Sequence, residues 1–183
     1  MHGPGHYGIN ALLFAPFLYV FAMFNQLELA LFVGCIMWIT ARLPDKDIYF
    51  DDSFSQGSAI LSLVPISHRG ITHTVWFAPA VGLVTGAGLA YLPIPGTTQF
   101  GRVFVGIFFG TLGITGHLLG DIITPMGLKP LAPASNQKWS FTICTASNFF
   151  ANSLFFLTGV LACLAAIYFG SPSLPPLADV LAG

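Results

Sequence analysis

Charged residues are scarce in this sequence. Asp, Glu, Lys and Arg make up 7% of the 183 residues, whereas about 25% is usual in a soluble domain. A soluble globule with so few charges could not cover its surface with polar groups. The 55% share of hydrophobic residues therefore indicates an integral membrane protein. The formal net charge of -1 also argues against a basic surface for nucleic acid, so we expect no nucleic-acid partner.

Cysteine is rare as well, and no two cysteines have the short spacing of a paired site. The three are Cys35, Cys144 and Cys163, which indicates neither a disulfide framework nor a cysteine-based zinc site. The sequence also lacks the G-x-S-x-G elbow and the H-E-x-x-H helix signature. A serine hydrolase is therefore not expected.

Long apolar runs are what the sequence does have, and they predict an all-α, polytopic membrane protein with about five transmembrane helices. The runs are continuous, whereas the strands of a membrane barrel would alternate in polarity. A helix needs about 20 apolar residues to span the bilayer. The third and fifth runs fit this length, while the first two are short and are expected to form a tight hairpin of marginal span. The runs cover residues 8–24, 28–43, 72–92, 101–123 and 149–169.

We predict one integral-membrane domain over residues 1–170, followed by a Pro-rich tail over residues 171–183. The first ten residues, MHGPGHYGIN, carry no Lys or Arg, although a signal peptide begins with a positively charged region. We therefore expect the first apolar run to be retained. The glycines of the fourth run have the small-xxx-small spacing that lets helices approach closely, and we assign them a packing role.

Threading five helices puts the N-terminus and the loops 44–71 and 124–148 on one face of the membrane. Five of the six basic residues lie there and only Arg102 lies on the other face, so the positive-inside rule makes the first face cytoplasmic and the C-terminus external. We expect this arrangement in the inner or plasma membrane of the cell. The same face collects all the histidines and five acids, and this predicts a polar site built from several helix ends: His2, His6, His68, His73, His117, Asp45, Asp47, Asp51, Asp52 and Asp121.

The stretch SHRGITHT, residues 67–74, is the densest polar element. It holds His68 and His73 where the long loop becomes the third helix, and Arg69 is suited to bind a phosphate with two hydrogen bonds. We expect Thr72 to cap that helix, with His73 in its first turn. The alternative is a helix cap with histidines that only lie at the membrane interface.

The stretch GHLLGD places His117 and Asp121 four residues apart, on one face of the fourth helix. Ionisable groups at this depth in a membrane are usually functional or paired. The pair could bind one divalent metal, or form a hydrogen bond that locks two helices together. Two other stretches offer further candidate ligands. RLPDKD contains Asp45 and Asp47, which are either metal ligands or the acids of a solvated turn. GPGHYGIN places His6 just before the first helix.

The sequence contains, in this order, the stretches GH, LPDKD, HRGITHT and GHLLGDIITPMGLKPLAP. This order of motifs resembles the YdjM-like family of membrane-bound, metal-dependent hydrolases. The protein that gives the family its name is regulated by LexA. The resemblance covers about residues 3–133 and implies a metal centre at the cytoplasmic membrane surface, with zinc expected and manganese as the alternative. Lys46 stands where family members often have an apolar residue. The implied ligands are His6, Asp45, Asp47, His68, His73, His117 and Asp121. The family is distantly similar to zinc-dependent phospholipases C, which implies a small-molecule or lipid phosphoester substrate.

Our leading hypothesis is hydrolysis of a phosphoester by metal-activated water at the lipid bilayer. In it, Asp45 and Asp47 bridge metals or act as general base, and Arg69 steadies the charge that develops on the phosphate. One or two zinc-like ions are held by His68, His73, His117 and Asp121.

Two rival functions use the same residues. In one, the cluster belongs to a non-enzymatic membrane protein that binds or transports metal. In the other, the histidines only cap helices. Transport predicts a polar path across the bilayer, yet the opposite half of the sequence offers little more than Glu28 and Arg102.

Overall fold

The computed structural model describes the chain except for residues 2, 47–69, 95–96, 173 and 175–183. Within the described residues the secondary structure is helical, apart from an isolated bridge between Leu128 and Trp139. The prediction of an all-α membrane protein is confirmed. The helices are α1 (Gly3–Met23), α2 (Leu27–Thr40), α4 (Phe77–Leu89), α5 (Gln99–Ile122) and α6 (Phe149–Gly170), with the 3-10 helices η1 (Pro44–Lys46) and η3 (Ile71–His73).

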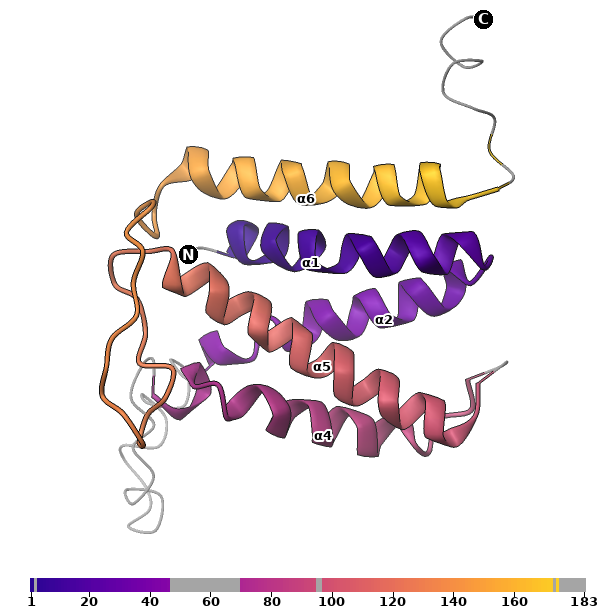
Figure 1. Ribbon diagram of the computed structural model, residues 1–183, viewed down its shortest axis with the longest axis horizontal. Coiled ribbons are helices and arrows are strands. Elements are labelled where there is room, and N and C mark those ends of the chain that lie inside the picture. The colour runs from indigo at the N-terminus through magenta and orange to yellow at the C-terminus, as the bar shows by residue number, and fades with distance from the viewer. Residues whose placement is uncertain (2, 47–69, 95–96, 173, 175–183) are drawn as a thin grey trace, which may run out of the picture.

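The five α-helices form a bundle whose long axes run in roughly the same direction (Figure 1). α1 packs against α6 on one side and against α2 on the other, and α5 contacts α1, α2 and α4. The N-terminus, η1, η3 and the 123–148 connection gather at one end of the bundle (Figure 1). We call this the site end. The α1–α2 turn, the α4–α5 turn and the end of α6 lie at the far end.

Helix lengths in the bundle are unequal. α1, α5 and α6 have 21, 24 and 22 residues and are long and apolar enough to cross a membrane. At about 1.5 Å per residue they measure roughly 32, 36 and 33 Å. α2 and α4 have only 14 and 13 residues, or about 20 Å each. The expected marginal length is thus right for α2 and wrong for α1.

The third apolar run does not form the full span that its length predicts. α4 begins only at Phe77, because Pro79 has no N–H to donate to a carbonyl one turn earlier and fits only the first turn of a helix. The Thr74 hydroxyl also donates to the Ile71 carbonyl at 2.8 Å, and Thr74 has extended backbone. The preceding residues therefore turn as the separate helix η3.

Close packing at glycine holds the helix pairs together. A Cβ on Gly106 of α5 would meet the backbone of Gly86 on α4. A Cβ on Gly159 of α6 would likewise meet the Gly8 backbone of α1. Helices approach this closely in membranes when small residues line the contact. The packing role predicted for the α5 glycines is confirmed.

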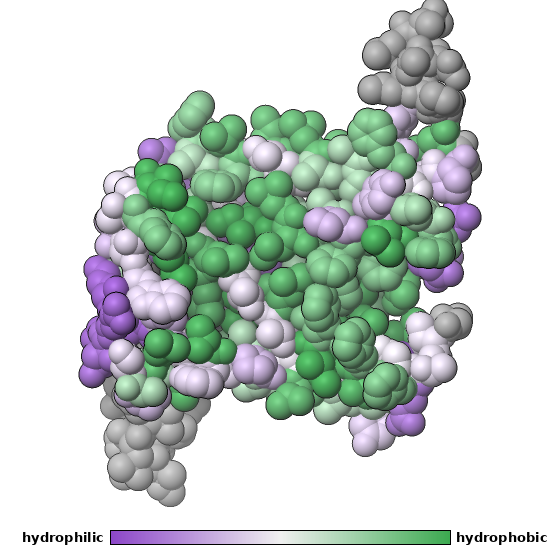
Figure 2. Space-filling model, in the orientation of Figure 1, coloured by the Kyte–Doolittle hydropathy of each residue, from purple (hydrophilic) through white to green (hydrophobic). Residues whose placement is uncertain are grey.

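Hydrophobic residues cover most of the visible surface over the helices, and hydrophilic residues gather at the two ends (Figure 2). Large apolar side chains such as Leu31, Val84 and Phe104 are 73%, 75% and 59% exposed. This pattern suits helices surrounded by lipid. A smaller apolar core, formed by Val33 and Met37 of α2 with Phe109 of α5, lies inside the bundle.

Side chains also fix helix ends at both ends of the bundle. The Thr98 hydroxyl accepts a hydrogen bond from the Gly101 N–H at 3.0 Å and caps α5. The Asn148 side chain accepts from the Ala151 N–H at 2.9 Å and caps α6. At the far end the Arg102 guanidinium donates to the Thr97 carbonyl at 3.0 Å and to the Ala90 carbonyl at 3.4 Å. These contacts connect the end of α4 to the start of α5.

Candidate metal centre

Five ionisable side chains from four separate segments meet at the site end. His6 comes from α1, Asp45 from η1, His73 from η3, and the pair of His117 and Asp121 from α5. The three histidines and Asp121 are at most 2% exposed. The Asp45 side chain is 45% exposed, so it is the member of the cluster that faces outward.

Small residues on α5 make room for the cluster. His117 and Asp121 lie on the inner face of α5, as their spacing of four residues predicts. A Cβ on Gly120 would lie only 2.5 Å from Nδ1 of His6. Glycine at this position therefore lets the His6 ring lie against α5.

The Asp121 carboxylate lies at the centre of the cluster. Its Oδ1 accepts a hydrogen bond from the Met1 amino group at 2.8 Å and lies 3.6 Å from Nε2 of His6. Its Oδ2 lies 3.4 Å from Nε2 of His73 and 3.7 Å from Nε2 of His117. One carboxylate thus faces all three imidazoles.

Backbone carbonyls orient two of the rings. His117 Nδ1 lies 2.8 Å from the Ala41 carbonyl, and a carbonyl can only accept, so Nδ1 carries the proton. Nε2 of the same ring then faces Asp45 Oδ1 at 3.5 Å. Such a second-layer contact is typical of histidines that bind metal. His6 Nε2 likewise lies 3.0 Å from the Met1 carbonyl.

The rings are also held by one another. His6 and His117 are stacked, with centroids 3.9 Å apart and an angle of 8° between the rings, and His73 meets His117 edge-on at 5.3 Å. With Nε2 of His6 donating to a carbonyl, its buried Nδ1 has no hydrogen-bond partner among the described residues. A buried lone pair without a partner is costly. A bound cation would offset this cost.

The donor set fits a divalent metal ion. The described residues form two groups of three possible ligands. Within each group, the ligand atoms all lie within 4.8 Å of one another, and His117 belongs to both groups. Imidazole nitrogen and carboxylate oxygen suit zinc and manganese, and no thiolate is among these donors. The groups are His6 with Asp45 and His117, and His73 with His117 and Asp121.

The structure brings together five of the seven ligands that the sequence suggested. Asp47 and His68, and with them Arg69, lie outside the described residues. The expectation that Thr72 caps the third helix is wrong, because that helix starts at Phe77 and has no side-chain cap. Instead the Thr72 hydroxyl lies 3.0 Å from Nδ1 of His73.

The sequence reasoning missed three partners of the rings, namely Thr72 and the carbonyls of Ala41 and Met1. Thr72 precedes His73 directly, so its role could have been suspected. The Ala41 carbonyl could not, because a backbone oxygen carries no sequence signal. Its contact with His117 joins residues 76 positions apart.

Fold and site together define a polytopic helical membrane protein with a buried His/Asp cluster that could hold a metal ion. The chain belongs to the YdjM inner membrane protein family, whose model matches residues 1–175. The family resemblance of the motifs is thereby confirmed. No curated protein and no solved structure matches the chain.

Proposed function

We propose that the protein is a membrane-embedded, metal-dependent hydrolase that cleaves a phosphoester. One observation carries the proposal, namely that side chains from α1, η1 and η3 converge on His117 and Asp121 of α5 inside an apolar bundle. Ionisable groups buried within a membrane are costly and are usually functional. A divalent ion held here, zinc or alternatively manganese, would supply Lewis-acid activation of water and of the phosphoester.

The side chains take different parts in this proposal. His73, His117 and Asp121 are fully buried and would hold the ion, with His117 kept in place by the Ala41 carbonyl. Asp45 is partly exposed, so substrate and water can reach it, and it is the candidate general base. Arg69 and Asp47 keep the roles that the sequence suggests.

The reaction is a simple hydrolysis. The oxygen of water forms a bond to phosphorus, and the ester P–O bond breaks with its electron pair on the leaving oxygen. Asp45 would take the proton that the attacking water loses. The leaving oxygen gains a proton, so the products are a phosphate and an alcohol.

Buried polar residues favour hydrolysis over the transport of metal. In the described part of the chain they all lie in the site half of the bundle: His6, Asn10, Thr40, His73, Thr74, His117, Asp121, Thr124 and Asn152. A transport path would need polar groups through the far half as well. We also propose that the site end faces the cytoplasm, because Arg42, Lys129 and Lys138 lie there and loops on the cytoplasmic side carry an excess of Lys and Arg.

The first experiment is a measurement of bound metal. Protein purified in detergent is analysed by plasma mass spectrometry beside His73→Ala/His117→Ala and a control, Arg102→Gln, at the far end. We expect about one or two equivalents of zinc or manganese in the wild type and control, and little in the double variant. Hydrolysis of phosphodiesters and phospholipids should follow the metal content.

Two results would contradict the proposal. Unchanged metal content in the double variant would remove the metal centre. A metal-loaded protein that cleaves no phosphoester would remove the hydrolase and favour the metal-binding rival.

A further inference from the structure

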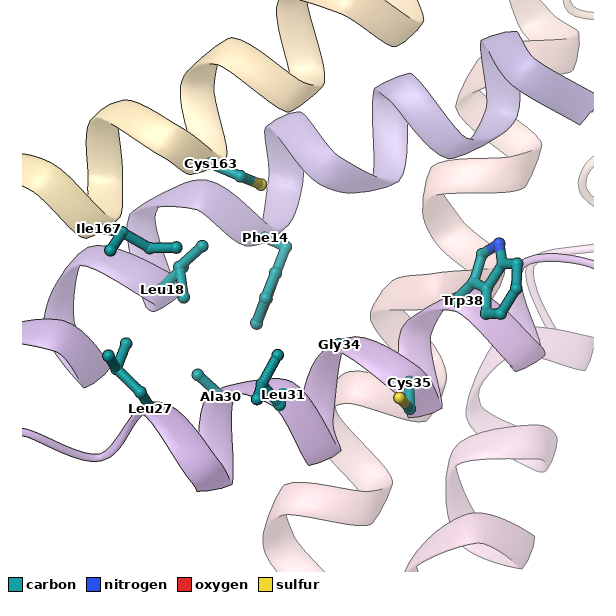
Figure 3. Close-up of a pocket in the computed structure, with 10 residues that line it drawn as sticks. All are labelled: Phe14, Leu18, Leu27, Ala30, Leu31, Gly34, Cys35, Trp38, Cys163 and Ile167. Atoms are coloured by element: carbon teal, nitrogen blue, oxygen red, sulfur yellow. The ribbon is translucent and has the colours of Figure 1, made fainter.

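An apolar groove runs along the outside of the bundle, over α1 and between α2 and α6 (Figure 3). Its cavity measures about 490 Å³. Phe14 and Leu18 of α1, Leu31 of α2 and Ile167 of α6 are among the side chains that surround it (Figure 3). Leu31 is 73% exposed, so the groove is open to the lipid that surrounds a membrane protein.

The groove continues toward the site end. A second cavity of about 150 Å³ shares Phe14, Gly34, Trp38 and Cys163 with the first and extends to Tyr7 and Asn10. Tyr7 and Leu18 are separated along α1 by about 16 Å, at about 1.5 Å per residue. This distance is close to half of the roughly 30 Å hydrocarbon thickness of a bilayer. The two cavities together therefore have the length of one lipid leaflet.

A positive charge stands at the polar end of this groove. The Arg42 guanidinium carbon lies 5.9 Å from the centre of the Tyr7 ring, and Tyr7 in turn lies 5.7 Å from the Trp38 ring. Arg42 directly follows Ala41, whose carbonyl binds His117. Arginine is well suited to bind a phosphate group. The groove thus leads from apolar surface to a cation, and this cation is next in the chain to a residue that holds one ring of the His/Asp cluster.

We propose that the groove holds one acyl chain of a phospholipid substrate, whose phosphate contacts Arg42 and presents its ester bond to the His/Asp cluster. The inference rests on the proposed function and names its substrate class, a membrane phospholipid in place of a water-soluble phosphoester. Ordinary surrounding lipid would contact every exposed apolar face alike. A substrate chain selects this groove.

A glycine in the groove permits a direct test. A Cβ on Gly34 would lie 3.4 Å from the Phe14 ring, so the side chain in Gly34→Leu occupies the cavity. Gly88→Leu on α4 is the matched control, because a Cβ there meets nothing within 4 Å. Both variants add the same side chain to a short helix. Their metal content is measured first and should equal that of the wild type.

Binding is then measured in nanodiscs that contain phosphatidylcholine or phosphatidylglycerol with a photoreactive group in one acyl chain. Labelling of the wild type should concentrate on α2 between Leu31 and Trp38. Gly34→Leu should reduce it about tenfold, the effect of losing contact with about two methylenes. Gly88→Leu should leave it unchanged. Equal labelling of all lipid-facing helices, or no loss in Gly34→Leu, would show surrounding lipid only and overturn the proposal.

Activity separates this proposal from the proposed function. In Gly34→Leu the kcat/KM for a long-chain phospholipid should fall about tenfold, while that for a water-soluble phosphodiester stays constant. If both substrates are cleaved as in the wild type, the groove is not a substrate site although the hydrolase stands. If lipid labels the groove but no phosphoester is cleaved, the hydrolase and the substrate role of the lipid both fail.

Discussion

The two ends of the bundle both place polar side chains among apolar helices, but in different ways. At the far end, the Arg102 guanidinium donates hydrogen bonds to the carbonyls of Thr97 and Ala90, which lie 5 and 12 residues away in the chain. Both acceptors are backbone carbonyls near helix ends.

 At the site end, side chains from segments far apart in the chain meet around Asp121. The comparison indicates that a side chain bonded to nearby backbone stabilises the fold. Ionisable side chains that converge from distant segments instead indicate a functional site.

The largest expected effect comes from Asp121→Asn. The amide keeps the shape of the carboxylate but removes the negative charge that faces three imidazoles. Loss of an outer-shell partner already lowers metal affinity roughly 10–100-fold, so the loss here should exceed that range. Zinc affinity, measured by competition with a chelator, checks this result.

The matched change at the far end is Arg102→Gln, which removes a charge without touching the cluster. Its zinc affinity should equal that of the wild type. If Arg102→Gln lowered zinc affinity as much as Asp121→Asn, the distinction between the two ends would be lost.

A pair of glycine variants should separate metal binding from stability. In Gly120→Ala the new methyl group meets the His6 ring, so the ring must move and zinc affinity should fall about tenfold. In Gly106→Ala the methyl group meets the backbone of Gly86. Because backbone cannot move aside as a ring can, this variant should lose about 1–3 kcal/mol of stability.

Zinc competition and thermal unfolding in detergent measure the two effects on the same samples. We expect each variant to change chiefly one of them. If Gly106→Ala loses metal while it remains fully folded, metal binding depends on the whole α4–α5 contact. That result would contradict the expectation that the cluster is a local site.

The smallest effects are expected from the two helix caps. Thr98→Ala at the far end and Asn148→Ala at the site end each remove one hydrogen bond to a helix N-terminus. Each should cost about 1 kcal/mol of stability. Thermal unfolding should report similar losses, and zinc affinity should not change in either variant. A loss of zinc in Asn148→Ala alone would extend the site to the start of α6.

The sequence was sufficient to predict the bundle and the approximate place of the cluster. Apolar runs located the five helices, and alternating helix direction brought His6, Asp45, His73 and Asp121 to one end. It was not sufficient for helix boundaries, because a long apolar run does not show where backbone hydrogen bonding begins. The late start of α4 depends on Pro79 and on the Thr74 hydroxyl.

Details that depend on tertiary packing were also beyond the sequence. The contact between His117 and the Ala41 carbonyl requires α2 and α5 to lie side by side. The groove likewise depends on how α2 and α6 flank α1, and its glycine, Gly34, looks like any small residue in an apolar run. The ligand role of each histidine stays a prediction until metal is measured.

The short helices α2 and α4 have a consequence for the membrane itself. At about 20 Å each, they fall well short of the roughly 30 Å hydrocarbon layer. A bilayer adapts to a short helix by becoming thinner around it. Lipid headgroups beside α2 are therefore drawn inward toward the level of Arg42 and Asp45. This thinning would bring the water boundary down toward the buried cluster, so that a lipid bound as proposed could reach it without leaving its leaflet.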